Sequence, residues 1–158
     1  MKLCDIVEKQ AIIPSLASTK RDEVVVELVE ALISAGAAPE SDRDALVKKV
    51  LEREKRGSTG FGRGVAVPHV KAEGAGGIHA AVGLSKAGID FDALDKQPVY
   101  TVFLLLSPAE KPEEHLRAME IVFKNLSQER FRSFLEQATT VDDVWTLLDE
   151  ADNDLVNG

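Results

Sequence analysis

The sequence predicts a single α/β domain in which a mixed β-sheet is flanked by helices on both faces. Three observations predict this fold class. Apolar residues recur with helical spacing before residue 57, a nearly continuous apolar run lies in the middle of the chain, and helical spacing returns after it. A length of 158 residues is enough for one domain with a substantial core. We expect this domain to occupy residues 1–150 and residues 151–158 to form a frayed tail.

Two helices are expected in the first part of the chain. The first lies between a capping residue, Thr19, and the helix-ending Gly36, and the second lies between the cap Asp42 and Gly57. Between those limits, valines and leucines recur three and four residues apart, so each helix has one apolar face. Ahead of them, residues 11–16 indicate a short strand that a proline interrupts.

Strands are expected next, at residues 65–67, 79–85 and 99–106. The third of these is a run of aliphatic and aromatic residues with hardly a polar position, which is typical of a central strand covered on both faces. A helix follows from Pro112, with two glutamates in its first turn, where acidic side chains suit the helix dipole. Two shorter helices close the chain, and Thr140 is expected to cap the last of them.

The charge and cysteine content of the chain limit which partners and which cellular location are expected. The chain has 19 basic and 27 acidic side chains and a net charge of −8, which argues against nucleic acid as the main partner. It fits a basic protein partner, or a surface kept in solution by charge. The single cysteine allows no internal disulfide, and we expect neither a signal peptide nor direct insertion into a membrane. A cytoplasmic location is therefore expected.

The most unusual stretch is "RGSTGFGRGVAVPHVK", residues 56–71, because it is so rich in glycine. A Walker A loop would need Lys-Ser or Lys-Thr after Gly62, where Arg63-Gly64 stands instead. The dinucleotide-binding pattern also fails, because Gly64 comes one residue too early. The stretch follows a helix and leads toward a strand, whereas both motifs lead from a strand into a helix, so both nucleotide interpretations are excluded.

A turn with closely spaced backbone amides remains possible for this stretch, and such amides can surround an anion. Pro68 fixes the backbone just before His69, a residue type that can act as acid, base or nucleophile, although a lone histidine after a turn is more often structural on the residues alone. The three histidines, His69, His79 and His115, lack the spacing of a zinc site. We therefore expect no metal and no cofactor.

Several blocks, in this order, resemble one known family. They are "LERE" at 51–54, "GSTGFGRGVAVPH" at 57–69, "GIDFDALDKQPVYTVFLLLSP" at 88–108, "HL" at 115–116 and "LEQATTVDDVWTLLDE" at 135–150. Together they resemble the enzyme IIA domains of the fructose/mannitol class in the bacterial phosphoenolpyruvate-dependent sugar phosphotransferase system, a class that includes nitrogen-regulatory IIA proteins. The resemblance covers nearly the whole of residues 1–150, so the expected domain is an enzyme IIA-like phosphocarrier domain.

The resemblance implies a specific chemistry. Such a domain accepts a phosphoryl group from the phosphohistidine of the carrier protein HPr, and His69 falls on the histidine that becomes phosphorylated. Arg53 falls on the phosphate-facing arginine of the family and His115 on its second active-site histidine. Thr59 and the amide of Gly60 are candidate phosphate donors that could equally serve only the turn.

Two functions remain open at this point. As a transport component, the protein would relay the phosphoryl group to a IIB domain during sugar uptake. As a regulatory module, it would bind a target protein according to the phosphorylation state of His69, with no sugar transported. The sequence names neither the sugar nor the target.

Overall fold

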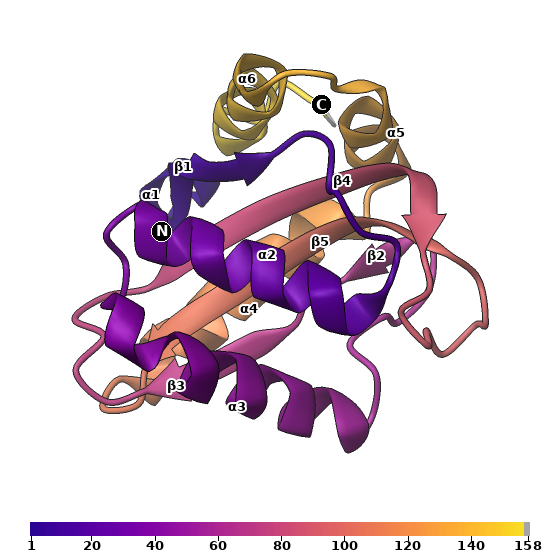
Figure 1. Cartoon of the computed structure of the whole chain (residues 1–158). Coiled ribbons are helices and arrows are strands. Elements are labelled where there is room, and N and C mark those ends of the chain that lie inside the picture. The colour runs from indigo at the N-terminus through magenta and orange to yellow at the C-terminus, as the bar shows by residue number, and fades with distance from the viewer. Residues whose placement is uncertain (157–158) are drawn as a thin grey trace.

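The computed structural model describes residues 1–156, and within them the chain forms helices and strands in a mixed order (Figure 1). In chain order these are α1 (Leu3–Ile6), β1 (Val7–Ile13), α2 (Arg21–Ser34), the 3₁₀ turn η1 (Glu40–Asp42), α3 (Arg43–Lys55), β2 (Val65–Ala66), β3 (His69–Ala72), β4 (His79–Ile89), β5 (Val99–Pro108), α4 (Pro112–Leu126), α5 (Glu129–Gln137) and α6 (Val141–Asp152).

The strands form one mixed sheet in the order β1-β4-β5-β2, and β3 also pairs with β5. The long central pair β4 and β5 is antiparallel, whereas β1 on β4 and both short strands on β5 are parallel. β2 and β3 follow one another along the same edge of β5: Val65 lies opposite Thr101, and His69 lies opposite Leu105. The edge of the sheet opposite β1 is therefore formed by β2 and β3, which act as one strand interrupted at residues 67–68.

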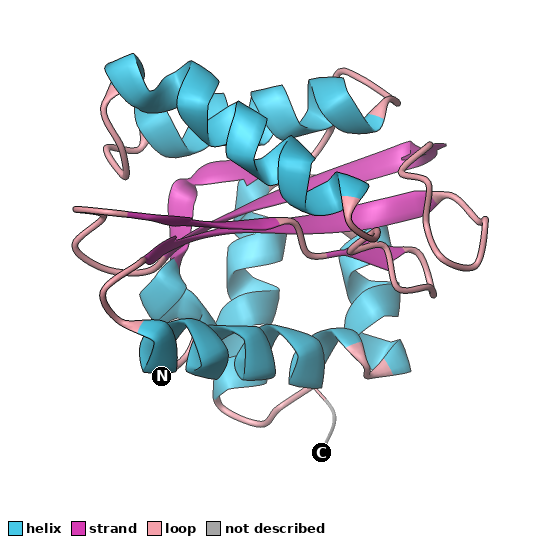
Figure 2. Cartoon of the chain, turned by 90° about the horizontal axis from the view of Figure 1, so that it is seen from below, coloured by secondary structure: helices cyan, strands magenta, loops and turns pink. Residues whose placement is uncertain are grey.

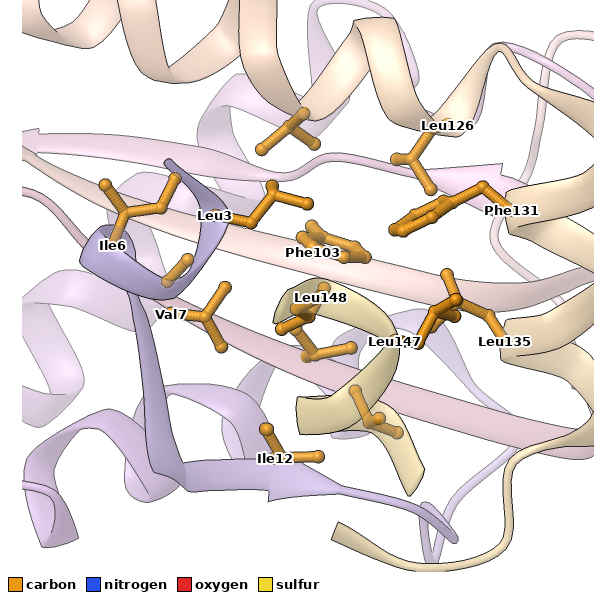
Figure 3. Close-up of a cluster of buried hydrophobic side chains, with 14 of the residues drawn as sticks. Leu3, Ile6, Val7, Ile12, Phe103, Leu126, Phe131, Leu135, Leu147 and Leu148 are labelled. Carbon is orange, nitrogen blue, oxygen red and sulfur yellow. The ribbon is translucent and has the colours of Figure 1, made fainter. Parts of the chain in front are cut away.

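Helices cover both faces of this sheet, which confirms the predicted fold class (Figure 2). One buried cluster joins the sheet to α2 and α3, and the other joins it to α1, α4, α5 and α6 (Figure 3). β5 supplies both clusters, because Phe103 and Leu105 point to the second and Val102 and Leu104 to the first. Alternate residues of β5 are therefore buried on opposite faces of the sheet, one set in each cluster. This explains why the apolar run in the sequence is continuous.

Helix ends agree in part with the predicted caps. Gly36 has φ +84°, and the amide of the next residue bonds back to the Leu32 carbonyl at 2.9 Å, which closes α2 as a glycine does. Thr140 accepts a hydrogen bond from the Asp143 amide at 3.0 Å, which confirms the cap of α6. Asp42 makes no side-chain capping bond, because the chain enters α3 through η1 instead.

The elements differ from the prediction in several places, among them the ends of β2, β4 and β5. β1 starts at Val7, immediately after α1, and β3 was not predicted because only Val70 in it is a strongly apolar strand former. The chain after residue 150 is also packed rather than frayed, since α6 continues to Asp152 and Val156 is only 4% exposed within the core. Residues 157–158 lie outside the described part of the chain. None of the helices in residues 1–156 has the length and apolar composition that crossing a bilayer requires.

Candidate functional site

His69 is the first residue of β3, the second piece of the edge strand. The Pro68 carbonyl faces β5 and accepts from the Leu105 amide at 3.0 Å, whereas the Val67 amide donates away from β5, to the Thr59 carbonyl at 3.3 Å. The Val67 carbonyl therefore lies on the outer side of the edge strand, where a side chain can reach it. Nδ1 of His69 lies 3.0 Å from that carbonyl oxygen. Because a carbonyl oxygen can only accept, Nδ1 carries the proton, and in the neutral ring the free electron pair is on Nε2. The half-buried His69 therefore has an unprotonated Nε2 available as a nucleophile.

His115 lies beside it. This histidine is the fourth residue of α4, is 6% exposed, and its ring centroid is 5.3 Å from that of His69, with the two ring planes inclined at 53°. Burial, with smaller contributions from the charges of His69 and Lys71, lowers the pKa of His115 to about 4. Its imidazole is consequently neutral at pH 7. Its Nδ1 is 2.7 Å from the hydroxyl oxygen of Ser107.

Both histidines open into one pocket of about 390 Å³. Arg53 lines this pocket as well, so the structure brings together the three residues that the sequence resemblance placed at the centre of the site. One guanidinium nitrogen of Arg53 donates to the Gly57 carbonyl at 2.8 Å, which leaves its other donors for a ligand. The remaining lining residues are Lys49, Glu52, Arg56, Val70 and Lys71.

The pocket is cationic in an acidic protein. Four of its lining side chains are lysine or arginine and one is glutamate, whereas the chain as a whole carries a net charge of −8. Arginine provides planar, paired donors that match phosphoryl or carboxylate oxygens, and lysine provides a compact positive charge. The local arrangement therefore suits a small anion with several oxygen atoms. Among residues 1–156, no group of three or more histidines, cysteines or carboxylates is arranged to hold a metal ion.

Thr59 and Gly60 do not line this pocket, in contrast to the expectation that they donate to phosphate. The Thr59 amide donates to the buried Glu54 carboxylate at 3.0 and 3.3 Å, and the Gly60 amide donates to the Ser58 hydroxyl at 3.0 Å. A Cβ on Gly60 would lie 3.0 Å from Cβ of Ala93. Their amides are already used by the turn, and the absence of a side chain at Gly60 allows close packing.

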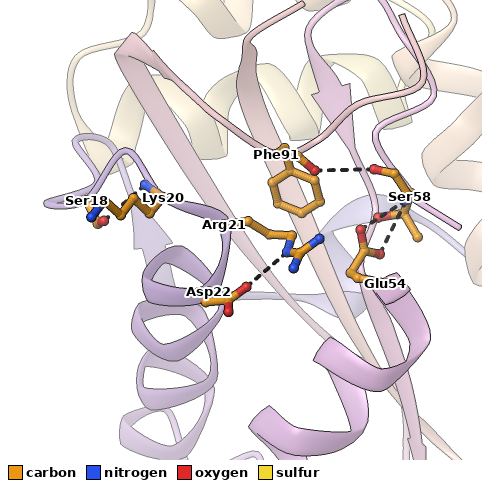
Figure 4. Close-up of polar contacts among 8 residues, drawn as sticks. Ser18, Lys20, Arg21, Asp22, Glu54, Ser58 and Phe91 are labelled. Carbon is orange, nitrogen blue, oxygen red and sulfur yellow. Dashed lines mark hydrogen bonds and ion pairs between the residues drawn. The ribbon is translucent and has the colours of Figure 1, made fainter. Parts of the chain in front are cut away.

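The glycine-rich turn is instead held against residues 91–98. The Gly60 carbonyl accepts from the Leu94 amide at 2.8 Å, and the Ser58 hydroxyl reaches the Phe91 carbonyl at 3.4 Å (Figure 4). Further along, Gly62 and Gly64 adopt φ values of +119° and +78°, a region that glycine enters without strain. The glycines thus shape the route from α3 to the edge strand that carries His69.

Sequence reasoning missed four residues of the site, of which three have a recognisable spacing in the sequence and the fourth is found only from the pairing of strands. Lys49 lies in α3 four residues before Arg53, and Arg56, the C-cap residue just after α3, lies three residues after it, so helical spacing places all three on one side. Lys71 follows His69 by two positions in β3 and therefore lies on the same side of that strand. Ser107 pairs with Lys71 across the ladder, which brings it to the same place from β5.

Together, these features define an α/β domain with two adjacent histidines in a cationic pocket. Residues 5–151 match the family model described as "Phosphoenolpyruvate-dependent sugar phosphotransferase system, EIIA 2", and the chain belongs to this family. The resemblance found in the sequence blocks is thereby confirmed.

The relatives include proteins named for nitrogen regulation and a protein named as a fructose-specific component. The chain is 36% identical over 129 residues to a Nitrogen regulatory protein of Pseudomonas aeruginosa, covering 82% of this chain and 83% of that protein. It is 32% identical over 152 residues to the PTS system fructose-specific EIIABC component of Bacillus subtilis, covering 96% of this chain but only 24% of that protein. The crystal structure of Nitrogen Regulatory Protein IIA-Ntr from Neisseria meningitidis superposes with a TM-score of 0.81 at 27% identity, covering 91% of this chain and 97% of that chain.

Proposed function

We propose that this protein is a phosphocarrier in which Nε2 of His69 accepts a phosphoryl group from the phosphohistidine of an HPr-type protein. The observation that carries the proposal is the hydrogen bond between Nδ1 of His69 and the Val67 carbonyl, because it leaves the electron pair on the nitrogen that can attack. Membership of the enzyme IIA family and the cationic pocket around His69 support the same chemistry.

In the transfer step, the N–P bond of the donor breaks as the Nε2–P bond of His69 forms, and the electron pair of the broken bond stays on the donor ring. The proton on Nδ1 remains in place. As Nε2 gives electron density to phosphorus, the His69 ring becomes more positive, and the hydrogen bond to the Val67 oxygen strengthens accordingly.

Charge on the equatorial phosphoryl oxygens is stabilised by the pocket. Arg53 falls on the family arginine in the sequence and lines the pocket, and its free donors can pair with two phosphoryl oxygens at once. Lys49, Arg56 and Lys71 add positive potential around it. These charges act on the group being transferred, so they serve both its arrival from the donor and its departure to an acceptor.

The phosphoryl group then has two possible uses. In the transport alternative, a IIB domain removes it during sugar uptake. In the regulatory alternative, its presence on His69 changes the affinity for a target protein. The match to most of the length of a Nitrogen regulatory protein supports the regulatory use, and the match to a fructose-specific EIIABC component supports transport.

The test is phosphorylation with purified components. With phosphoenolpyruvate, enzyme I and HPr, the protein should take up one acid-labile, base-stable phosphate, and His69→Ala should take up none. His79→Ala is the matched control, because His79 pairs with Glu8 at 2.7 Å and does not line the pocket. Labelling of the His69→Ala variant would refute the assignment. Loss of uptake of one sugar in a deletion strain would then identify transport, and a target captured by only one phosphorylation state would identify regulation.

A further inference from the structure

Ser107 is a fully buried polar residue next to the proposed reaction centre. It lies in β5 opposite Lys71, has 0% exposure, and its hydroxyl oxygen is 2.7 Å from Nδ1 of His115. Within residues 1–156 this is the hydrogen bond that the Ser107 side chain makes. The phosphocarrier reaction as described so far gives the contact no role.

The contact can be made in two ways. Either the Ser107 hydroxyl donates to an unprotonated Nδ1, or a protonated Nδ1 donates to the Ser107 oxygen. In the second arrangement, the hydroxyl proton of a fully buried serine would have no acceptor in the described part of the chain. A buried hydroxyl donor without an acceptor costs free energy, so the equilibrium between the two arrangements favours the first by roughly tenfold or more.

In the first arrangement, a neutral His115 must carry its proton on Nε2. The two imidazoles are then opposite tautomers: His69 has its proton on Nδ1 and a free pair on Nε2, whereas His115 has a free pair on Nδ1 and a proton on Nε2. Because His115 lines the pocket and its Nδ1 is used by Ser107, Nε2 is the polar atom with which it can meet a ligand.

We propose that Ser107 is a positioning residue: its hydroxyl fixes the Nε2–H tautomer of His115, so that His115 donates a hydrogen bond to the phosphoryl group transferred at His69. This inference rests on the proposed phosphocarrier function. Ser107 itself does not touch the phosphoryl group, and it acts through the ring of His115. The low pKa of His115 agrees with this role, because the ring donates as a neutral group.

The first test is nitrogen NMR on the unphosphorylated wild-type protein with ¹⁵N-labelled histidine at pH 7.5. His115 should show an unprotonated Nδ1 and a protonated Nε2. A protonated Nδ1 on His115 would overturn the proposal without any variant. Because this measurement needs no phosphoryl donor, it is independent of the proposed function, whose own failure would appear as absence of labelling at His69.

The second test is the rate of phosphorylation by phospho-HPr. Removing a transition-state hydrogen-bond donor outright typically costs a hundredfold or more, so releasing the tautomer in Ser107→Ala should cost about tenfold and should give a mixture of His115 tautomers. Ser107→Thr restores the hydroxyl and should recover most of the rate. Ser85→Ala is the matched control, since Ser85 is also a buried strand serine but accepts from the Gly88 amide at 3.1 Å and does not line the pocket.

An unchanged rate and an unchanged tautomer in Ser107→Ala would overturn the proposal. So would an equal loss of rate in Ser107→Ala and Ser85→Ala, because that result would show a general effect of losing a buried hydroxyl. Thermal melting of all three variants confirms that the rates compare folded proteins.

Discussion

Acidification from pH 7.5 to 5.5 should destabilise the protein through His115. The pKa of this group is about 4 in the folded protein and about 6.5 as a free side chain, so the unfolded chain binds more protons throughout this range. Stability therefore falls as the pH falls, and the full contribution of the neutral ring is present only above the unfolded pKa. For one group with these two values, the free energy of unfolding should drop by roughly 1 kcal/mol across the range.

The assay is urea denaturation of the wild-type protein and of His115→Gln at both pH values. Other titrating groups are common to the two proteins, so the difference between their unfolding free energies isolates His115. That difference should shrink by roughly 1 kcal/mol on going to pH 5.5, because only the wild type loses the contribution of the neutral ring. The range stops there since the sequence has an isoelectric pH of about 4.9, close to which solubility falls. A difference that is the same at both pH values would refute the reasoning.

Three further predictions follow from the turn and the pocket. Gly60→Ala should lower the free energy of unfolding, measured by urea denaturation, by about 1–3 kcal/mol, because the added Cβ would lie 3.0 Å from Cβ of Ala93. An unchanged free energy of unfolding would show that this packing is loose. Thr59→Val should leave stability unchanged or raise it by up to about 1 kcal/mol, because the buried Thr59 hydroxyl has no hydrogen-bond partner within residues 1–156. A large loss in phosphorylation rate would restore the phosphate role suggested by the sequence. Replacing Lys49 and Arg56 by glutamine should slow phosphorylation by phospho-HPr severalfold and weaken its dependence on salt, and an unchanged salt dependence would exclude steering by these charges.

Much of the layered fold could be predicted because it follows from periodicity. The valines and leucines of α2 repeat with helical spacing, and the unbroken apolar run of β5 indicates burial on two faces. β3 could not be found in this way. Half of its four residues are polar, and what makes it a strand is pairing with β5, more than thirty residues further along the chain.

The candidate site also has residues that the sequence predicts and residues that it does not. His69, Arg53 and His115 could be predicted to share one site because the residues around them match a known family, not because their spacing shows that they meet. The role expected of Thr59 and Gly60 depended on where individual amides point, and a glycine-rich sequence allows many directions. Only the folded chain shows those amides bonded to Glu54 and Ser58.

The break at Val67 and Pro68 has a consequence for how the protein behaves at high concentration. A long, regular outer strand offers a row of unpaired amides and carbonyls on which another chain can align, and this is a common route to aggregation. Here the outer strand is cut into pieces of two and four residues, with a proline between them that has no amide to offer. The two short pieces and the proline between them thus make this edge of the sheet, the one opposite β1, a poor template for self-association.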